Sequence, residues 1–187
     1  MLQVAKGVNY LHKNRVVHRD LKSHNILVMR MKCRDGKEFV CAKLADFGLS
    51  KTKETSTTFS NQTLNTGTTR WMAPELMGPQ TSESQTSTSR SDEIKYPFKC
   101  DVYSFGMVCF EILTGEVPFQ STSSPNALKR MVLDGKRPIL PNDCPNYLKN
   151  LIQSCWKSDA SIRPSFGDIC VILKTLKWSL ITKFLEI

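Results

Sequence analysis

A dense polar segment between two apolar runs most constrains how this chain can fold. Residues 15–28 read RVVHRDLKSHNILV, in which Val16-Val17 and Ile26-Leu27-Val28 enclose a cluster of polar and charged residues. The apolar runs favour burial, whereas the charged residues between them need water or partners of opposite charge. The segment is therefore either a solvated turn between two core elements or a loop that performs chemistry.

The composition suits a folded domain with a basic surface. Of the 187 residues, 40% are hydrophobic and 23% are charged, which fits one globular domain, or part of a larger one, with a sizeable core. The net charge of +9 could favour anionic partners. The basic residues form no long run, which favours the alternative that the charge serves only solubility. No helix-turn-helix, zinc-finger or aromatic-basic sheet motif accompanies this charge, so we expect no nucleic-acid partner.

The cysteine pattern indicates a reducing compartment. Seven cysteines are present, which is an odd number, and no two form a CxxC pair. This pattern argues against a disulfide framework and against a zinc site.

The N-terminal residues lack the continuous apolar core of a signal peptide, and residues 101–113 are too few to span a membrane. We expect a cytoplasmic protein with no membrane span.

Hydrophobic spacing and turn residues predict a mainly helical chain with one hairpin. Apolar residues in 1–12 share one helical face, and residues 26–44 read as two strands around Asp35-Gly36, a dipeptide suited to a tight turn. Residues 46–75 read as irregular, and residues 78–93 as a low-complexity segment rich in Ser and Thr. Helices are predicted at the ranges 100–115, 125–135, 145–157 and 165–178.

Five motifs follow one another in a fixed order. HRDLKxxN occupies residues 18–25, DFG residues 46–48, GTTRWMAPE residues 67–75, DVYSFG residues 101–106, and Arg-Pro residues 163–164. In this order they resemble the eukaryotic protein kinase superfamily. The residues within these motifs are similar to those of the tyrosine-kinase-like group, with its Raf-like and mixed-lineage serine/threonine kinases, and resemble plant members most. The resemblance implies a mainly α fold: the C-terminal lobe of a kinase, a helical bundle with a small β-hairpin beside the catalytic loop.

The resemblance assigns phosphoryl transfer to five residues. Asp20 is expected to act as the base that orients the attacking hydroxyl, and Lys22 to meet the γ-phosphate. Asn25 and Asp46 offer the hard oxygen ligands that Mg²⁺ takes. Thr68 resembles the threonine that bridges the catalytic Asp and Lys of serine/threonine kinases. We therefore expect a serine/threonine protein kinase with ATP and Mg²⁺ as cofactors and a protein as substrate.

Other residues resemble structural and regulatory positions of kinases. His18 is expected to pack beneath Phe47, and Arg19 to pair with a phosphate that an upstream kinase adds to the activation segment, residues 46–75. That segment offers eight Ser and Thr residues between positions 52 and 66, and the sequence does not select among them. The set is completed by Gly48 of the DFG motif, Leu27 beside the nucleotide, Asp101 holding the catalytic loop, and the ion pair of Glu75 with Arg163.

The sequence also departs from the family. Neither a GxGxxG motif nor a VAIK strand occurs in the 187 residues. We therefore expect residues 1–187 to be a partial kinase domain without the small lobe that covers the nucleotide, and to be inactive alone. The apolar hairpin around Leu27 and Val28 is then expected to be exposed. The alternative function is a non-catalytic binding module. Residues 78–93 form an insertion near the region where substrates dock in similar kinases.

Overall fold

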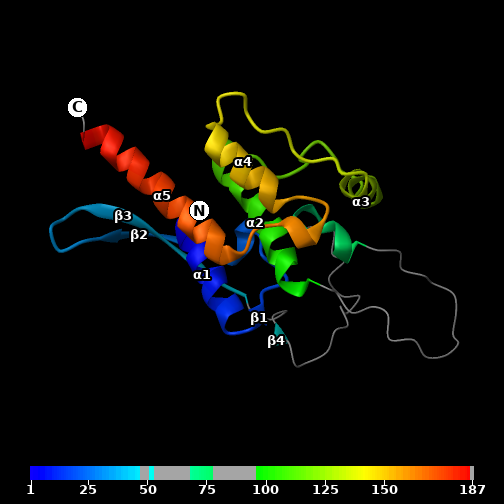
Figure 1. Cartoon of the computed structure of the whole chain (residues 1–187), viewed down its shortest axis with the longest axis horizontal. Coiled ribbons are helices and arrows are strands. Elements are labelled where there is room, and N and C mark those ends of the chain that lie inside the picture. The colour runs from blue at the N-terminus through cyan, green and yellow to red at the C-terminus, as the bar shows by residue number, and fades with distance from the viewer. Residues whose placement is uncertain (47–50, 53–67, 78–95, 186–187) are drawn as a thin grey trace, which may run out of the picture.

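The chain forms a mainly helical body from which one long hairpin extends (Figure 1). The computed structural model describes residues 1–46, 51–52, 68–77 and 96–185. The elements, in which η denotes a 3₁₀ helix, are α1 Leu2–Lys13, β1 Val16–Val17, η1 Ser23–Asn25, β2 Ile26–Lys32, β3 Glu38–Leu44, β4 Lys51–Thr52, η3 Thr68–Trp71, η4 Pro74–Leu76, α2 Pro97–Thr114, α3 Pro125–Leu133, α4 Asn146–Cys155, η5 Ala160–Ile162 and α5 Phe166–Leu185. The predicted mainly α architecture with a hairpin next to the polar loop is confirmed.

Helix α2 runs through the centre of the molecule because it is apolar on nearly all sides. Every residue from Cys100 to Phe110 is buried, including the charged Asp101. The helix begins at Pro97, three residues before the predicted start, since the fixed φ of proline suits the first helical turn. It ends at the predicted glycine: Gly115 adopts a φ of 73° and donates its N–H to the carbonyl of Glu111 at 2.8 Å.

The other long helices close the core around α2. Helix α4 lies against α2, and α1 packs against α5. Phe105 of α2 meets Phe166 of α5 edge-on, with ring centroids 5.3 Å apart. Gly106 allows α4 to approach closely, because a Cβ atom there would stand 3.1 Å from the Cβ of Cys155. Helix α5 continues to Leu185, beyond the predicted end at residue 178, since neither Gly nor Pro occurs between residues 178 and 185.

The two strands predicted around Asp35-Gly36 form an antiparallel hairpin. Strands β2 and β3 pair in one register from Ile26 opposite Leu44 to Lys32 opposite Glu38. Gly36 takes the positive φ of 81° that the tight turn requires. The hairpin is attached to the body at one end only, so its apolar residues away from α1 remain in contact with water; Leu27 is 55% exposed and Val28 is 64% exposed.

Two short elements fix the ends of the polar loop. Strand β1 pairs with β4, with Val17 opposite Lys51, and Val17 is buried in the core. At the other end the loop closes through η1 directly into β2. The loop, residues 18–25, is thus held between the core and the hairpin and is not a freely solvated turn.

The structure also describes the cysteines and the lengths of the helices. All seven cysteines are free thiols, and five of them are buried. Within the described ranges, no helix combines the length and the apolar character needed to cross a membrane.

The packing of α4 on α2 predicts a large loss of stability when Ile152→Ala opens a cavity. Ile152 is fully buried, whereas Ile112, on α2, is 51% exposed. We expect Ile152→Ala to lower the free energy of unfolding by about 2–5 kcal/mol. The same change at Ile112 should stay within about 0.5 kcal/mol. Urea unfolding followed by circular dichroism compares the two variants, and equal losses would contradict the placement of the core.

Candidate active site

Asp20 occupies the centre of the polar loop and is buried despite its charge. Its Oδ2 accepts hydrogen bonds from the Nζ of Lys22 at 2.7 Å and from the Nδ2 of Asn25 at 3.0 Å. Its Oδ1 is buried and has no hydrogen-bond partner among the described residues. A buried carboxylate oxygen is costly to leave unsatisfied, so Oδ1 is available to a donor other than the described residues.

Lys22 joins the loop to the C-terminal part of the activation segment. Its ammonium group donates to Asp20 and also to the Oγ1 of Thr68 at 3.1 Å, across 46 residues of sequence. Thr68 begins η3, which packs on α2. The structure therefore brings together three residues that the sequence selected from two separate motifs.

Asn25 and Asp46 lie close in the fold because the hairpin returns to the loop. The side-chain nitrogen of Asn25 donates to the backbone carbonyl of Asp20 at 2.7 Å as well as to its carboxylate. This leaves the amide oxygen as the ligand atom that Asn25 can offer a cation. Ala45 donates its N–H to the carbonyl of Asn25 at 2.9 Å, which places Asp46 one residue further along, with a φ of 57°.

This donor set suits Mg²⁺ in partnership with phosphate. An amide oxygen and a carboxylate are hard ligands, and Mg²⁺ usually completes its shell with water and substrate phosphates. No group of three or more His, Cys, Asp or Glu residues that could hold a metal occurs in the part of the chain that the structure describes. Asn25 and Asp46 can therefore offer one amide oxygen and one carboxylate to a hard cation.

Asp101 of α2 anchors the backbone of the loop. Its Oδ2 accepts the N–H of His18 at 2.8 Å, and its Oδ1 accepts the N–H of Arg19 at 2.9 Å. Arg19 has a φ of 68°, a left-handed conformation that costs a non-glycine residue about 1–3 kcal/mol. The two charge-assisted hydrogen bonds offset this cost, and so fix the direction in which the loop presents Asp20.

His12 is part of the same anchor, and the sequence analysis assigned it no role. Its Nε2 lies 2.8 Å from the Oδ2 of Asp101. Its ring packs edge-on against Phe98 and Phe166, at centroid distances of 4.9 and 5.1 Å. The sequence indicated only the orientation of His12, because it falls four residues after Val8 on the apolar face of α1, and did not indicate its partner.

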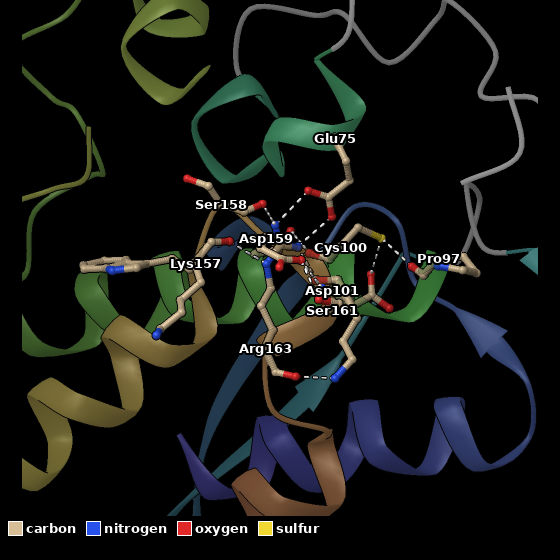
Figure 2. A network of polar contacts seen from close by, with 12 residues as sticks. Glu75, Pro97, Cys100, Asp101, Lys157, Ser158, Asp159, Ser161 and Arg163 are labelled. Carbon is tan, nitrogen blue, oxygen red and sulfur yellow. Dashed lines mark hydrogen bonds and ion pairs between the residues drawn. The ribbon is translucent and has the colours of Figure 1, made fainter. Parts of the chain in front are cut away.

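Glu75 and Arg163 form a bidentate ion pair in Figure 2, where the guanidinium lies below the η4 segment. The Nη1 and Nη2 atoms of Arg163 meet the two oxygens of Glu75 at 2.6 and 2.8 Å. The Nε atom donates to the carbonyl of Lys157 at 2.8 Å, Nη1 also donates to that of Lys99, and the guanidinium stands 5.2 Å from the ring centre of Tyr103. The side chain of Arg163 is fully buried, and each of its three guanidinium nitrogens donates at least one hydrogen bond.

A second carboxylate bridge reaches the loop from α2 and was not predicted. Glu111 accepts hydrogen bonds from the Oγ of Ser23 at 2.9 Å and from the Nε1 of Trp71 at 2.7 Å. Ser23 follows Lys22 directly, and Trp71 closes the η3 helix that Thr68 begins. Burial raises the pKa of Glu111, and the hydrogen bonds from Trp71 and Ser23 oppose this rise in pKa. Only the tertiary fold brings these three residues together, so no local sequence signal could have identified the bridge.

Some predicted site residues are placed only in part. His18 is fully buried, but Phe47, with which it was expected to pack, lies outside the described residues together with Gly48. Most of the activation segment and the insertion at 78–93 also lie outside them. Leu27 lies at the start of β2, immediately beyond the loop, and its side chain is exposed.

Comparison with known proteins agrees with this geometry. The profile of the protein tyrosine and serine/threonine kinase family matches residues 1–173. The chain is 54% identical to a light-sensor protein kinase of Ceratodon purpureus over 98% of its own length and 14% of that protein. It is 36% identical to the serine/threonine-protein kinase STY17 of Arabidopsis thaliana over 94% of the chain and 26% of that protein. It is 38% identical to the dual specificity protein kinase pyk3 of Dictyostelium discoideum over 93% of the chain and 11% of that protein.

These matches define the class of the protein. The chain belongs to the eukaryotic protein kinase superfamily, where it resembles the tyrosine-kinase-like group. The family predicted from the order of the five motifs is therefore confirmed. The chain spans between 11% and 26% of the length of these three relatives.

The ion pair of Glu75 with Arg163 predicts a specific loss of stability. Glu75→Gln removes the carboxylate from a buried guanidinium, and we expect the free energy of unfolding to fall by about 2–3 kcal/mol, because three carbonyls still hold Arg163. Glu38→Gln is the matched control, since Glu38 pairs with Lys32 on the exposed hairpin. We expect that change to cost less than about 0.5 kcal/mol. Urea unfolding of both variants measures the difference, and similar costs would refute a structural role for the buried pair.

The raised pKa of Glu111 predicts how stability depends on pH. In the window between the ordinary pKa of glutamate and the raised one, the folded chain binds a proton that the unfolded chain has released. The stability due to Glu111 is therefore complete below the window and is lost as the pH rises through it. Glu111→Gln should remove this dependence, whereas the exposed Glu116→Gln should preserve it. Unfolding by urea at a series of pH values from about 4 to 7 tests this; an unchanged slope in Glu111→Gln would show the assignment to be wrong.

Proposed function

We propose that this chain carries the catalytic loop of a serine/threonine protein kinase, which transfers the γ-phosphoryl group of ATP to protein hydroxyls. The observation that carries the proposal is the position of the Lys22 ammonium between Asp20 and Thr68. Family membership and the names of the serine/threonine kinases among the relatives support it. The whole protein's activity, substrates and partners are part of the proposal.

Asp20 is proposed to be the base. The incoming Ser or Thr hydroxyl donates a hydrogen bond to the buried Oδ1, which accepts none from the described residues. The hydroxyl oxygen attacks the γ-phosphorus, the bond between this phosphorus and the β–γ bridging oxygen breaks, and ADP leaves with the electron pair. The hydroxyl proton passes to Asp20. The hydrogen bonds from Lys22 and Asn25 to Oδ2 hold the carboxylate in one orientation during this step.

Lys22, Asn25 and Asp46 are proposed to manage the charge of the triphosphate. Lys22 supplies a compact cation that can turn from Asp20 toward the γ-phosphate. Asn25, through its amide oxygen, and Asp46, through its carboxylate, would hold Mg²⁺, which neutralises phosphate charge when it is bound. Leu27, exposed beside them on β2, provides an apolar contact for the nucleotide.

The remaining predicted residues are proposed to act by positioning and regulation. Asp101 is proposed to hold the loop against α2, and the Glu75–Arg163 pair to hold the end of the activation segment there. Arg19 is proposed to order the activation segment, residues 46–75, after an upstream kinase phosphorylates that segment, and His18 to support Phe47 and Gly48. Residues 78–93 are proposed as an insertion that influences docking of the protein substrate, and signalling in the cytoplasm is the proposed setting.

A binding module is the second candidate, and the exposed hairpin favours it. We propose that residues 1–187 form the large lobe of a kinase domain, and the transfer described above needs a small lobe to enclose the nucleotide. The apolar side chains of Leu27 and Val28 are exposed where such a lobe or another partner could contact them. The intact mass of the native protein separates the two candidates. A mass above 21.2 kDa with peptides from an upstream segment supports the kinase, and a mass of 21.2 kDa supports the binding module.

The proposed base predicts a loss of phosphoryl transfer in Asp20→Asn. The native protein, expressed from its own gene and isolated with an antibody against residues 166–177, is assayed with labelled ATP and a Ser/Thr substrate protein. We expect Asp20→Asn to lower the rate about 100-fold or more, since an amide cannot accept the proton. Asp143→Asn, at an exposed site, is the control and should retain full activity. Transfer that persists in Asp20→Asn would refute the role of Asp20.

A further inference from the structure

Helix α2 holds the polar loop at both of its ends. Asp101 accepts backbone N–H groups at the start of the loop, and Glu111 accepts the hydroxyl of Ser23 near its end. The two carboxylates are ten residues apart on one helix, a rise of about 15 Å. Since α2 is buried between them, both attachments are made to one rigid element. Asp20 and Lys22 lie in the stretch of loop between the two attachments.

Trp71 is fixed to the same helix by two hydrogen bonds. Its indole Nε1 donates to the Oε2 of Glu111 at 2.7 Å, and its carbonyl accepts from the Oγ of Ser104 at 2.8 Å. Ser104 and Glu111 are seven residues apart, close to two helical turns, so they share one face of α2. Trp71 is buried, and the ring of His24 meets it edge-on at a centroid distance of 5.9 Å. The end of η3 is therefore docked on the face of α2 that also holds Ser23.

Glu111 reaches the neighbours of two residues that touch each other. Helix η3 runs from Thr68 to Trp71, and residues three apart in a 3₁₀ helix are aligned on one side. A displacement of Trp71 would therefore carry Thr68 with it. On the loop side, Ser23 follows Lys22 directly. Glu111 thus contacts a neighbour of each partner in the hydrogen bond between Lys22 and Thr68.

The position of the Lys22 ammonium depends on how firmly its two acceptors are held. Its Nζ donates to Asp20 at 2.7 Å and to Thr68 at 3.1 Å. The flexible stem of a lysine loses much rotamer freedom when its end is fixed. The side chain is still 20% exposed, so water can replace either acceptor. Both hydrogen bonds persist only while the loop and η3 keep their present separation.

We propose that Glu111 is a positioning residue for phosphoryl transfer, because its carboxylate sets the separation at which Lys22 contacts Asp20 and Thr68 together. One oxygen serves each segment: Oε1 binds the loop, and Oε2 binds η3. Glu111 acts through Lys22 and does not itself touch the reacting atoms. Its role in catalysis rests on the proposed function, whereas the fixing of Lys22 does not.

Two substitutions at Glu111 separate hydrogen bonding from the filling of space. Glu111→Leu keeps a side chain of similar size and removes both acceptors. Glu111→Gln can keep both bonds, since its amide oxygen accepts from the indole of Trp71 and its amide nitrogen donates to the hydroxyl of Ser23. A role that depended only on packing would make Glu111→Leu the milder change. The proposed role makes it the more harmful one.

The reactivity of Lys22 tests the positioning without an assay of transfer. The native protein is treated briefly with acetic anhydride, and mass spectrometry of its peptides compares acetylation at Lys22 with that at Lys37, whose side chain is 84% exposed. We expect Glu111→Leu to raise the relative rate at Lys22 about fivefold or more, and Glu111→Gln to leave it within about twofold, because only the first variant releases the ammonium to water. Trp71→Phe removes the indole N–H and should resemble Glu111→Leu, so it carries the test if that variant does not fold.

The kinetics of phosphoryl transfer by the same preparations give the second test. We expect Glu111→Leu to lower kcat about tenfold or more with the KM for ATP within about twofold, and Glu111→Gln to retain at least about half of kcat. In a Thr68→Val background, Glu111→Leu should lower kcat no further, because the contact that it supports is already lost. Glu116→Leu, exposed just beyond α2, is the control and should keep full activity.

The outcomes of the two tests are distinguishable. Lys22 reactivity that stays unchanged in Glu111→Leu and Trp71→Phe overturns the proposal, whatever the rate of transfer. Effects of Glu111→Leu and Thr68→Val on kcat that combine additively overturn the role in catalysis. If the wild-type protein transfers no phosphate while Lys22 reactivity changes as expected, the proposed function fails and the fixing of Lys22 by Glu111 stands. Far-ultraviolet circular dichroism verifies that each variant is folded.

Discussion

The carboxylate of Asp101 is the interaction on which the arrangement of the site depends. It is fully buried on α2 and accepts hydrogen bonds from the backbone of His18 and Arg19 and a contact from the ring of His12. A buried charge of this kind is stable only while its partners remain in place, so it fixes the position of the loop relative to the core. The strained backbone of Arg19 and the orientation of Asp20 both follow from this one constraint.

Helix α2 extends this control to a second segment. Arg163 packs beside Tyr103 of α2 and binds Glu75, and Glu111 of α2 binds both Ser23 and Trp71. The loop with Asp20 and the segment with Thr68 are therefore fixed to the same rigid helix at several points. Such multiple attachment is what allows Lys22 to reach groups from both segments at hydrogen-bond distance, because neither segment can move independently.

The hairpin differs from the rest of the molecule because fewer of its backbone groups are paired and fewer of its apolar side chains are buried. Its base packs on α1, and Gln3 covers part of the β3 edge, but β2 keeps an open edge and an exposed apolar face. Exposed edges and apolar faces of this size are normally covered in stable proteins. The hairpin is therefore the part of the described chain that its own contacts enclose least.

The sequence by itself determined the helices, the hairpin turn at Gly36, and the identity of the residues in the loop, because these depend on local periodicity and on residue types at short spacing. It also indicated the pair of Glu75 and Arg163, through resemblance to a family. Only the tertiary structure decided that His12 contacts Asp101, that Glu111 joins Ser23 to Trp71, and which edge of the hairpin stays open. These contacts join residues 40 to 89 positions apart, and a buried hydrogen bond over such a distance depends on how whole helices pack, which no local pattern in the sequence encodes.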